Sequence, residues 1–154
     1  MSDDRSLMHL SRDAIEAFCT RHAGGERASA FEAGLPVRVE RLDWPGAYLL
    51  VPVRDGSGLR GIVQFDAVRL SVESTAAIRD PGAAFLTSGD AALAAARAAL
   101  PGGATWGTPF LGWRPCRESA DSMQPLWVIP HRGGHVYVSQ SGRVFEELSS
   151  GRGG

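Results

Sequence analysis

Hydrophobic residues recur with helical spacing near the start of the chain. Four side chains fall at i, i+3, i+4 and i+7, which places them on one helix face. They are Ile15, Phe18, Cys19 and His22. Ser11 can cap the start because its hydroxyl can accept a hydrogen bond from a free N–H of the first turn, with Leu10 and Ile15 as a hydrophobic staple. The spacing predicts a helix over residues 11–22.

Three candidate strand segments follow, residues 35–43, 48–55 and 59–74. In the first, Val37 and Val39 alternate with charged residues, which is typical of a half-buried strand. Turns rich in Gly, Pro and Ser separate the segments. The third is long for one strand, so we expect it to bend near Asp66 or Ala67.

The second half of the chain shows a similar order. Residues 89–100 are rich in Ala, which has the best helix propensity, and Ser88 is the expected cap. A strand is predicted at 108–114 and a polar loop at 115–125. Residues 125–148 then read as strand, Gly-Gly turn, strand, Ser-Gly turn, strand.

Short anchor sequences recur at a nearly constant offset between the halves. They are Asp13-Ala14 with Asp90-Ala91, and Pro52-Val53-Arg54 with Pro130-His131-Arg132. One helix over three antiparallel strands buries one sheet face. A unit of about 65 residues is marginally stable alone, so two such units are expected to share their packing.

We therefore expect an α+β fold with two helix-plus-antiparallel-sheet repeats, each reading helix, strand, strand, strand. The repeats span about 10–74 and 87–150, joined by a linker at 75–86, and pack into one compact domain over residues 1–154. Chance similarity between two ordinary α+β segments stays open as the alternative.

The second half of the chain resembles PepSY or peptidase-propeptide modules, through the stretch DAALAAARAALPGGATW followed by PLWVIPHRGGHVYVSQSGRVFEEL. Extended to the first half, the resemblance implies two tandem copies of the module. This sequence has Ser139 where the family usually has Asp before the turn at Ser141-Gly142. The resemblance implies a non-catalytic module that binds, and sometimes inhibits, a peptidase or another protein. Such modules are usually exported, whereas no signal segment is recognised in this chain.

Composition narrows the function classes. Net charge is −1, and no basic block occurs in the 154 residues, so nucleic acid is disfavoured as a partner. All basic residues other than His are Arg, which excludes Schiff-base and P-loop lysines. The abundance of Ala, Gly and Arg indicates a GC-rich bacterial gene.

The expected compartment is the cytoplasm. No apolar run reaches the length of a signal core or a membrane span, so no membrane association is expected. Cys19 and Cys116 lack CxxC spacing and indicate free thiols.

Two constellations of reactive side chains have simpler explanations. His131 and His135 flank a Gly-Gly turn and could bind zinc or copper as near-facing neighbours, but no further ligands lie close in sequence. Cys19 with His22 could form a nucleophile, yet a buried thiol beside a packed histidine is commoner. We expect no metal, no cofactor, no catalytic residue and no enzyme activity.

A group of aromatic and arginine side chains in the second half forms the candidate partner-binding site. It consists of Trp106, Phe110, Trp113, Arg114, Arg117 and Trp127. Trp and Arg are favoured anchors at protein interfaces. The alternative is that Trp113 and Trp127 are core residues under the Ala-rich helix.

The sequence thus favours a cytoplasmic protein-binding module: an inhibitor, immunity or accessory protein that acts through an exposed strand edge or the Trp/Arg-rich loop. The partner is another protein of unknown identity, and homodimer formation stays open. The alternative is a small-molecule binder or enzyme that uses a cavity between the two sheets. A deep polar pocket would favour that alternative, and a flat apolar patch would favour the module.

Overall fold

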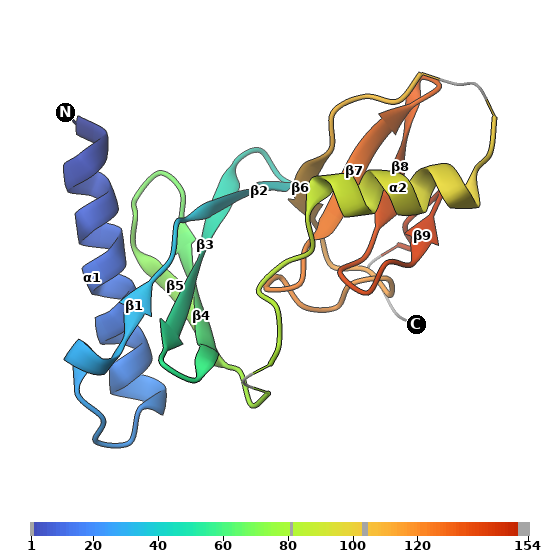
Figure 1. The fold of residues 1–154 in the computed structure, drawn as a ribbon. Helices are drawn as coiled ribbons and strands as arrows, with labels where there is room; N and C mark the ends of the chain where they lie inside the picture. Colours follow the sequence, from blue (N-terminus) through green and yellow to red (C-terminus); the bar gives the residue numbers. More distant parts are fainter. Residues whose placement is uncertain (1, 81, 103–104, 151–154) are drawn as a thin grey trace. The chain divides into compact units, whose positions relative to one another are not determined.

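The computed structural model describes residues 2–80, 82–102 and 105–150. Its contacts divide the chain into two units. Unit 1 comprises residues 1–38 and 47–85, and unit 2 comprises residues 39–46 and 86–154. In each unit an α-helix packs on β-strands, so the fold is α+β (Figure 1).

Unit 1 is an antiparallel sheet with a long helix against it. The described elements are α1 (Ser2–His22), a 3₁₀ helix (Ala28–Ala30), β1 (Glu32–Ala33), β3 (Ala47–Asp55), β4 (Gly58–Asp66) and β5 (Val72–Ala77). β3, β4 and β5 form a meander, and β1 pairs with the end of β3. α1 contacts all four strands.

The first helix starts at Ser2, well before the predicted cap at Ser11. Ser11 therefore lies inside α1, and Leu10 belongs to the buried stripe instead of a staple. The buried positions are Leu10, Ala14 and Phe18 at i, i+4 and i+8, whereas His22 is exposed. Tertiary packing along an apolar face stabilises a helix beyond what local signals indicate, which accounts for α1 from Leu10 onward, whereas Leu7 and Met8 in the earlier turns are exposed.

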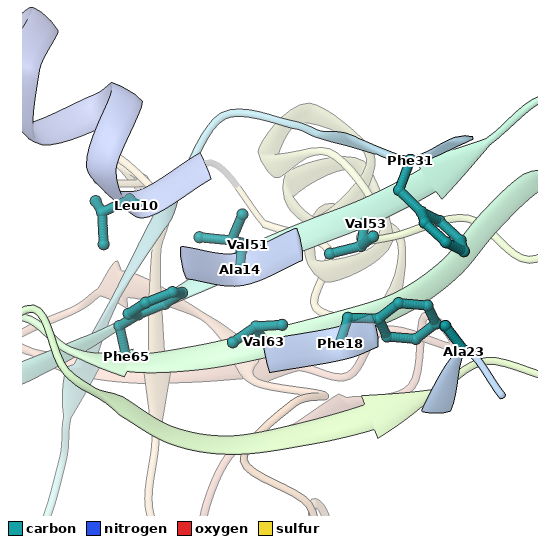
Figure 2. Close-up of a cluster of buried hydrophobic side chains, with 9 residues drawn as sticks. All are labelled: Leu10, Ala14, Phe18, Ala23, Phe31, Val51, Val53, Val63 and Phe65. Atoms are coloured by element: carbon teal, nitrogen blue, oxygen red, sulfur yellow. The ribbon is translucent and has the colours of Figure 1, made fainter. Parts of the chain in front are cut away.

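The unit 1 core lies between α1 and the meander (Figure 2). Its buried side chains are Leu10, Ala14, Phe18, Ala23, Phe31, Val51, Val53, Val63 and Phe65. Phe18 meets Phe31 edge to face, with ring centroids 5.3 Å apart. Gly61 lets the helix approach the sheet, because a Cβ there would lie 2.4 Å from the Phe18 ring.

The long predicted strand 59–74 is two strands, β4 and β5, with the expected bend at Asp66. A carboxylate oxygen of Asp66 accepts hydrogen bonds from the backbone N–H groups of Val68 and Arg69. These bonds hold a turn that ends at Leu70, whose φ of 54° is in the left-handed region. The bend is thus specified by a short polar side chain.

Unit 2 is built from a short helix and a second set of strands. The described elements are α2 (Gly89–Ala99), β6 (Phe110–Trp113), β7 (Leu126–His131), β8 (Gly134–Val138) and β9 (Val144–Phe145), with the end of β2 (Val37–Arg41). β6 to β9 form an antiparallel meander. β2 pairs with β6 in parallel, through Glu40 with Gly112 and Arg41 with Trp113.

α2 begins where the sequence predicts. The Ser88 hydroxyl accepts a hydrogen bond from the N–H of Ala91 at 3.1 Å, which confirms the N-cap. Small side chains let α2 lie close to the sheet. Its buried cluster joins Ala92 and Ala96 to Ile129, Val136 and Val138.

The predicted count of three strands per repeat is wrong. The described residues contain nine strands. Two of the additional strands, β1 and β9, are only two residues long, and the third arises because the run 59–74 is divided into β4 and β5. The predicted antiparallel strand at 35–43 also pairs in parallel, with the second half of the chain. The predicted linker 75–86 overlaps β5, and its residue 81 lies outside the described residues.

Candidate interaction surface

The six predicted partner-binding residues fall into separate sets in unit 2. Phe110 pairs with Val128, whereas the next residue, Leu111, pairs with Trp127. Because consecutive strand residues point to opposite faces, Phe110 and Trp127 lie on opposite faces of the sheet. Trp127 packs against the cluster under α2, so Phe110 lies on the face away from the helix.

Trp127 and Trp106 support the structure on the α2 face. The indole N–H of Trp127 donates to the carbonyl of Thr87 at 3.1 Å. Trp106 packs against the same cluster and stacks on His131, with ring centroids 3.8 Å apart and an interplanar angle of 14°. Both rings are half-buried. For Trp127 this agrees with the alternative drawn from the sequence, in which it packs under the Ala-rich helix.

Trp113 and Arg114 hold the 115–125 loop and the segment after β9. The Trp113 indole donates to the carbonyl of Ser119 at 3.1 Å. The Arg114 guanidinium donates to the carbonyls of Ser149 at 2.8 Å, Leu148 at 3.0 Å and Pro115 at 3.3 Å. These contacts occupy the side chain inside the unit.

The 115–125 loop is tied to the segment after β9 by a second set of bonds. The Glu118 carboxylate accepts hydrogen bonds from the N–H and the hydroxyl of Ser149. Burial opposes ionisation of Glu118, but its own backbone N–H and the two Ser149 donors outweigh burial and lower the Glu118 pKa. Glu118 is therefore a carboxylate with its acceptors engaged.

Arg117 is the predicted site residue that borders a pocket of about 320 Å³. The lining includes Arg117, Glu118, Ser139, Ser141, Arg143 and Phe145. Arg117 comes from the 115–125 loop and Arg143 from the turn between β8 and β9. The Arg143 guanidinium lies over the Phe145 ring, 5.5 Å from its centroid. The lining is mostly polar, and Phe145 adds an aromatic ring.

Backbone and hydroxyl hydrogen bonds fix the turn that forms one wall of this pocket. The Ser139 hydroxyl accepts from the N–H of Arg143 at 3.1 Å, and its oxygen lies 2.9 Å from that of Ser141. Gly142, with φ of 85°, supplies the left-handed residue of the turn. The turn thus presents Ser139, Ser141 and Arg143 in a defined arrangement.

Gln140 anchors this turn to the rest of unit 2. Its side-chain oxygen accepts from the N–H of Thr87 at 2.8 Å and from the Thr87 hydroxyl at 3.1 Å. Its amide nitrogen donates to the carbonyl of Pro125 at 2.7 Å. The same side chain therefore positions the pocket wall, the approach to α2 and the end of the 115–125 loop.

A row of residues across the sheet face away from α2 was not predicted from the sequence. The row follows the strand register: Phe110 on β6, Val128 on β7, Tyr137 on β8 and Phe145 on β9. The three rings are partly exposed, whereas Val128 between Phe110 and Tyr137 is buried. Exposed His135 lies beside them, with centroid distances of 6.4 Å to Phe110 and 6.5 Å to Tyr137. Alternation within each strand was visible in the sequence, but the register that aligns the rings was not.

Trp44 is a second feature that the sequence did not single out as a binding residue. It is 72% exposed, in the turn that follows β2. A large exposed ring of this kind is a candidate anchor for a partner.

The histidine pair expected to face each other across the turn does not do so. His135 pairs with Pro130, and His131 pairs with Gly134, so consecutive positions place the two imidazoles on opposite faces. Among the described residues, no group of three or more His, Cys, Asp or Glu side chains could hold a metal ion.

The surroundings of the Cys19 and His22 side chains do not favour a nucleophilic thiol. Burial and the nearby Glu26 carboxylate raise the pKa of Cys19, which disfavours the thiolate. His22 forms a hydrogen bond with the Thr75 hydroxyl at 2.9 Å. Burial likewise raises the pKa of Cys116, whose thiol donates to the Ser119 carbonyl at 3.7 Å.

Comparison with known proteins gives no relative. No protein-family model, curated protein or solved structure matches this chain. Within the described residues, neither helix is long and apolar enough to cross a membrane.

Proposed function

We propose that this chain is a non-catalytic protein-binding module, and that it captures its partner on the sheet face of unit 2 away from α2. The Arg/aromatic surface is defined by six residues. They are Phe110, Arg117, His135, Tyr137, Arg143 and Phe145. Of the residues expected from the sequence, Phe110 and Arg117 keep the proposed binding role. Trp106, Trp113, Arg114 and Trp127 are assigned to positioning because their contacts lie within the unit.

One observation carries the proposal: partly exposed rings lie in a single cross-strand row that ends at two arginine side chains. Aromatic residues and Arg supply much of the binding energy at interfaces, because they bury large areas with few rotatable bonds and several donors. The strand register holds the rings in place before binding, which reduces the entropy lost on association.

The proposal extends to the origin and setting of the protein. In unit 1, α1 is followed by the antiparallel strands β3–β5, and in unit 2, α2 is followed by the antiparallel strands β7–β9. This shared order supports an internal duplication. The PepSY-like sequence pattern supports an inhibitor, immunity or accessory role. Two free thiols support a cytoplasmic setting. An experimental structure in which the two units fail to superimpose would contradict the duplication.

Site-specific photo-crosslinking in the producing cells tests the binding role. A photoreactive phenylalanine analogue at Tyr137 should give one discrete adduct with another protein. The same analogue at Arg97, an exposed position of α2, should give none. Equal labelling from both positions, or no adduct from Tyr137, would contradict the proposal. An adduct of twice the chain mass would identify a homodimer as the bound form.

A further inference from the structure

The pocket at the end of the aromatic row holds two cationic side chains that pair with no carboxylate among the described residues. Arg143 is exposed, and its guanidinium contacts only the Phe145 ring in that part of the chain. Arg117 is also exposed. Within the described residues, its hydrogen bond runs from its backbone N–H to the Ser149 hydroxyl at 2.9 Å and does not involve the guanidinium. By contrast, Arg114 and Arg60 have their donors engaged. Arg117 and Arg143 both line one cavity.

A hydroxyl donor adds to these two groups. Ser139 and Ser141 form one hydrogen bond with each other, which uses one of their two protons. The Ser139 oxygen also accepts from the N–H of Arg143, so the second proton remains for a ligand. Guanidinium forks and hydroxyl donors together match the oxygen atoms of an anion.

Glu118 reduces the positive charge of the pocket. It lines the same pocket, and its lowered pKa keeps it ionised near neutral pH. With two guanidinium groups and one carboxylate, the pocket side chains carry a net charge of +1. A net charge of +1 attracts an anion, and the anionic groups that a protein partner carries are the carboxylates of its Asp and Glu side chains. A volume of about 320 Å³ is at the small end for ligand pockets and suits one acidic side chain.

We propose that this pocket binds the carboxylate of a Glu or Asp in an acidic segment of the partner protein. Arg117 and Arg143 hold the two oxygens, and a serine hydroxyl donates to one of them. An apolar neighbour of that residue packs on Phe145 and Tyr137. This inference rests on the proposed function and specifies the chemistry of its partner.

Peptide binding tests the inference directly. The probe is an acetylated, amidated peptide Phe-Glu-Glu-Phe, with Phe-Gln-Gln-Phe as the neutral match, titrated into the full chain labelled with nitrogen-15. The Glu peptide should shift the arginine side-chain signals of Arg117 and Arg143 and bind at least about tenfold more tightly than the Gln peptide. Equal affinities, or no shifts up to millimolar peptide, would overturn the proposal.

Charge variants separate this inference from the proposed function. Arg143→Gln and Arg117→Gln should each abolish the preference for Glu over Gln, whereas Arg97→Gln, the same charge change on α2, should keep it. Inorganic phosphate that binds more tightly than the Glu peptide would overturn the carboxylate assignment in favour of a phosphate site. If the crosslink from Tyr137 persists in both pocket variants, the carboxylate site is refuted while the protein-binding role stands. Loss of the crosslink only in the pocket variants supports both.

Discussion

The guanidinium of Arg114 donates a hydrogen bond of 2.8 Å to the carbonyl of Ser149, joining the end of β6 to the segment after β9. The two residues are far apart in sequence and belong to the same unit. With further bonds to Leu148 and Pro115, Arg114 works as a clamp. Arg114 was predicted to bind a partner, and these contacts support a positioning role instead.

Arg114→Ala should lower the free energy of unfolding by about 1.5–3 kcal/mol, because hydrogen bonds from a charged donor to carbonyls are lost. Urea unfolding measures this loss, and hydrogen exchange should rise in the N–H of Ser149. Arg117→Ala removes an exposed side chain of the same type and should change stability by less than about 0.5 kcal/mol. Equal effects of the two variants would contradict the assignment.

Gly61→Ala should destabilise unit 1 by about 1–3 kcal/mol through overpacking. The added Cβ would lie 2.4 Å from the Phe18 ring and 2.7 Å from the Ala76 carbonyl, so the helix or the strand must move. Gly56→Ala is the control because a Cβ added at Gly56 would have no atom within 4 Å. Thermal unfolding should show a lower Tm for the first variant alone.

Gln140→Ala removes three hydrogen bonds, two from Thr87 and one to Pro125. We expect a loss of about 1–3 kcal/mol, since the Thr87 N–H and the Pro125 carbonyl lose their partner. Ser141→Ala changes the exposed neighbour and should be close to neutral. Unchanged denaturation midpoints for Gln140→Ala would show that water replaces these bonds fully.

Glu118 should make stability depend on pH. Because the folded-state pKa of Glu118 lies below the unfolded value, its stabilisation is present above that unfolded value and is lost as pH falls through the folded pKa. Glu118→Gln should therefore be less stable than the parent chain near pH 7, with the difference shrinking toward about pH 3. Urea unfolding at both pH values measures this. A difference independent of pH would mean that the charge of Glu118 has no role.

Local signals located most elements because they depend on neighbouring residues. The cap at Ser88, the bend at Asp66 and the hairpin turn after His131 each follow from side-chain or glycine chemistry within a few positions. The start of α1 at Ser2 was missed, because the local cap signal at Ser11 indicated a later start.

The candidate site was harder to predict because it depends on partners distant in sequence. Trp127 and Phe110 looked alike in the sequence, but strand register sends one beneath α2 and the other to the opposite face. Arg114 and Arg117 also looked alike, and only the return of Ser149 distinguishes a clamp from an exposed cation.

The sequence by itself determined an α+β chain with helices near residues 11–22 and 89–100, and strands in the apolar segments between turn residues. Only the tertiary structure decided the parallel pairing of β2 with β6, the alignment of Phe110, Tyr137 and Phe145, and the pocket between Arg117 and Arg143. The physical reason is that periodicity is a local property of the backbone, whereas register and pocket walls arise from hydrogen bonds between segments that are remote along the chain.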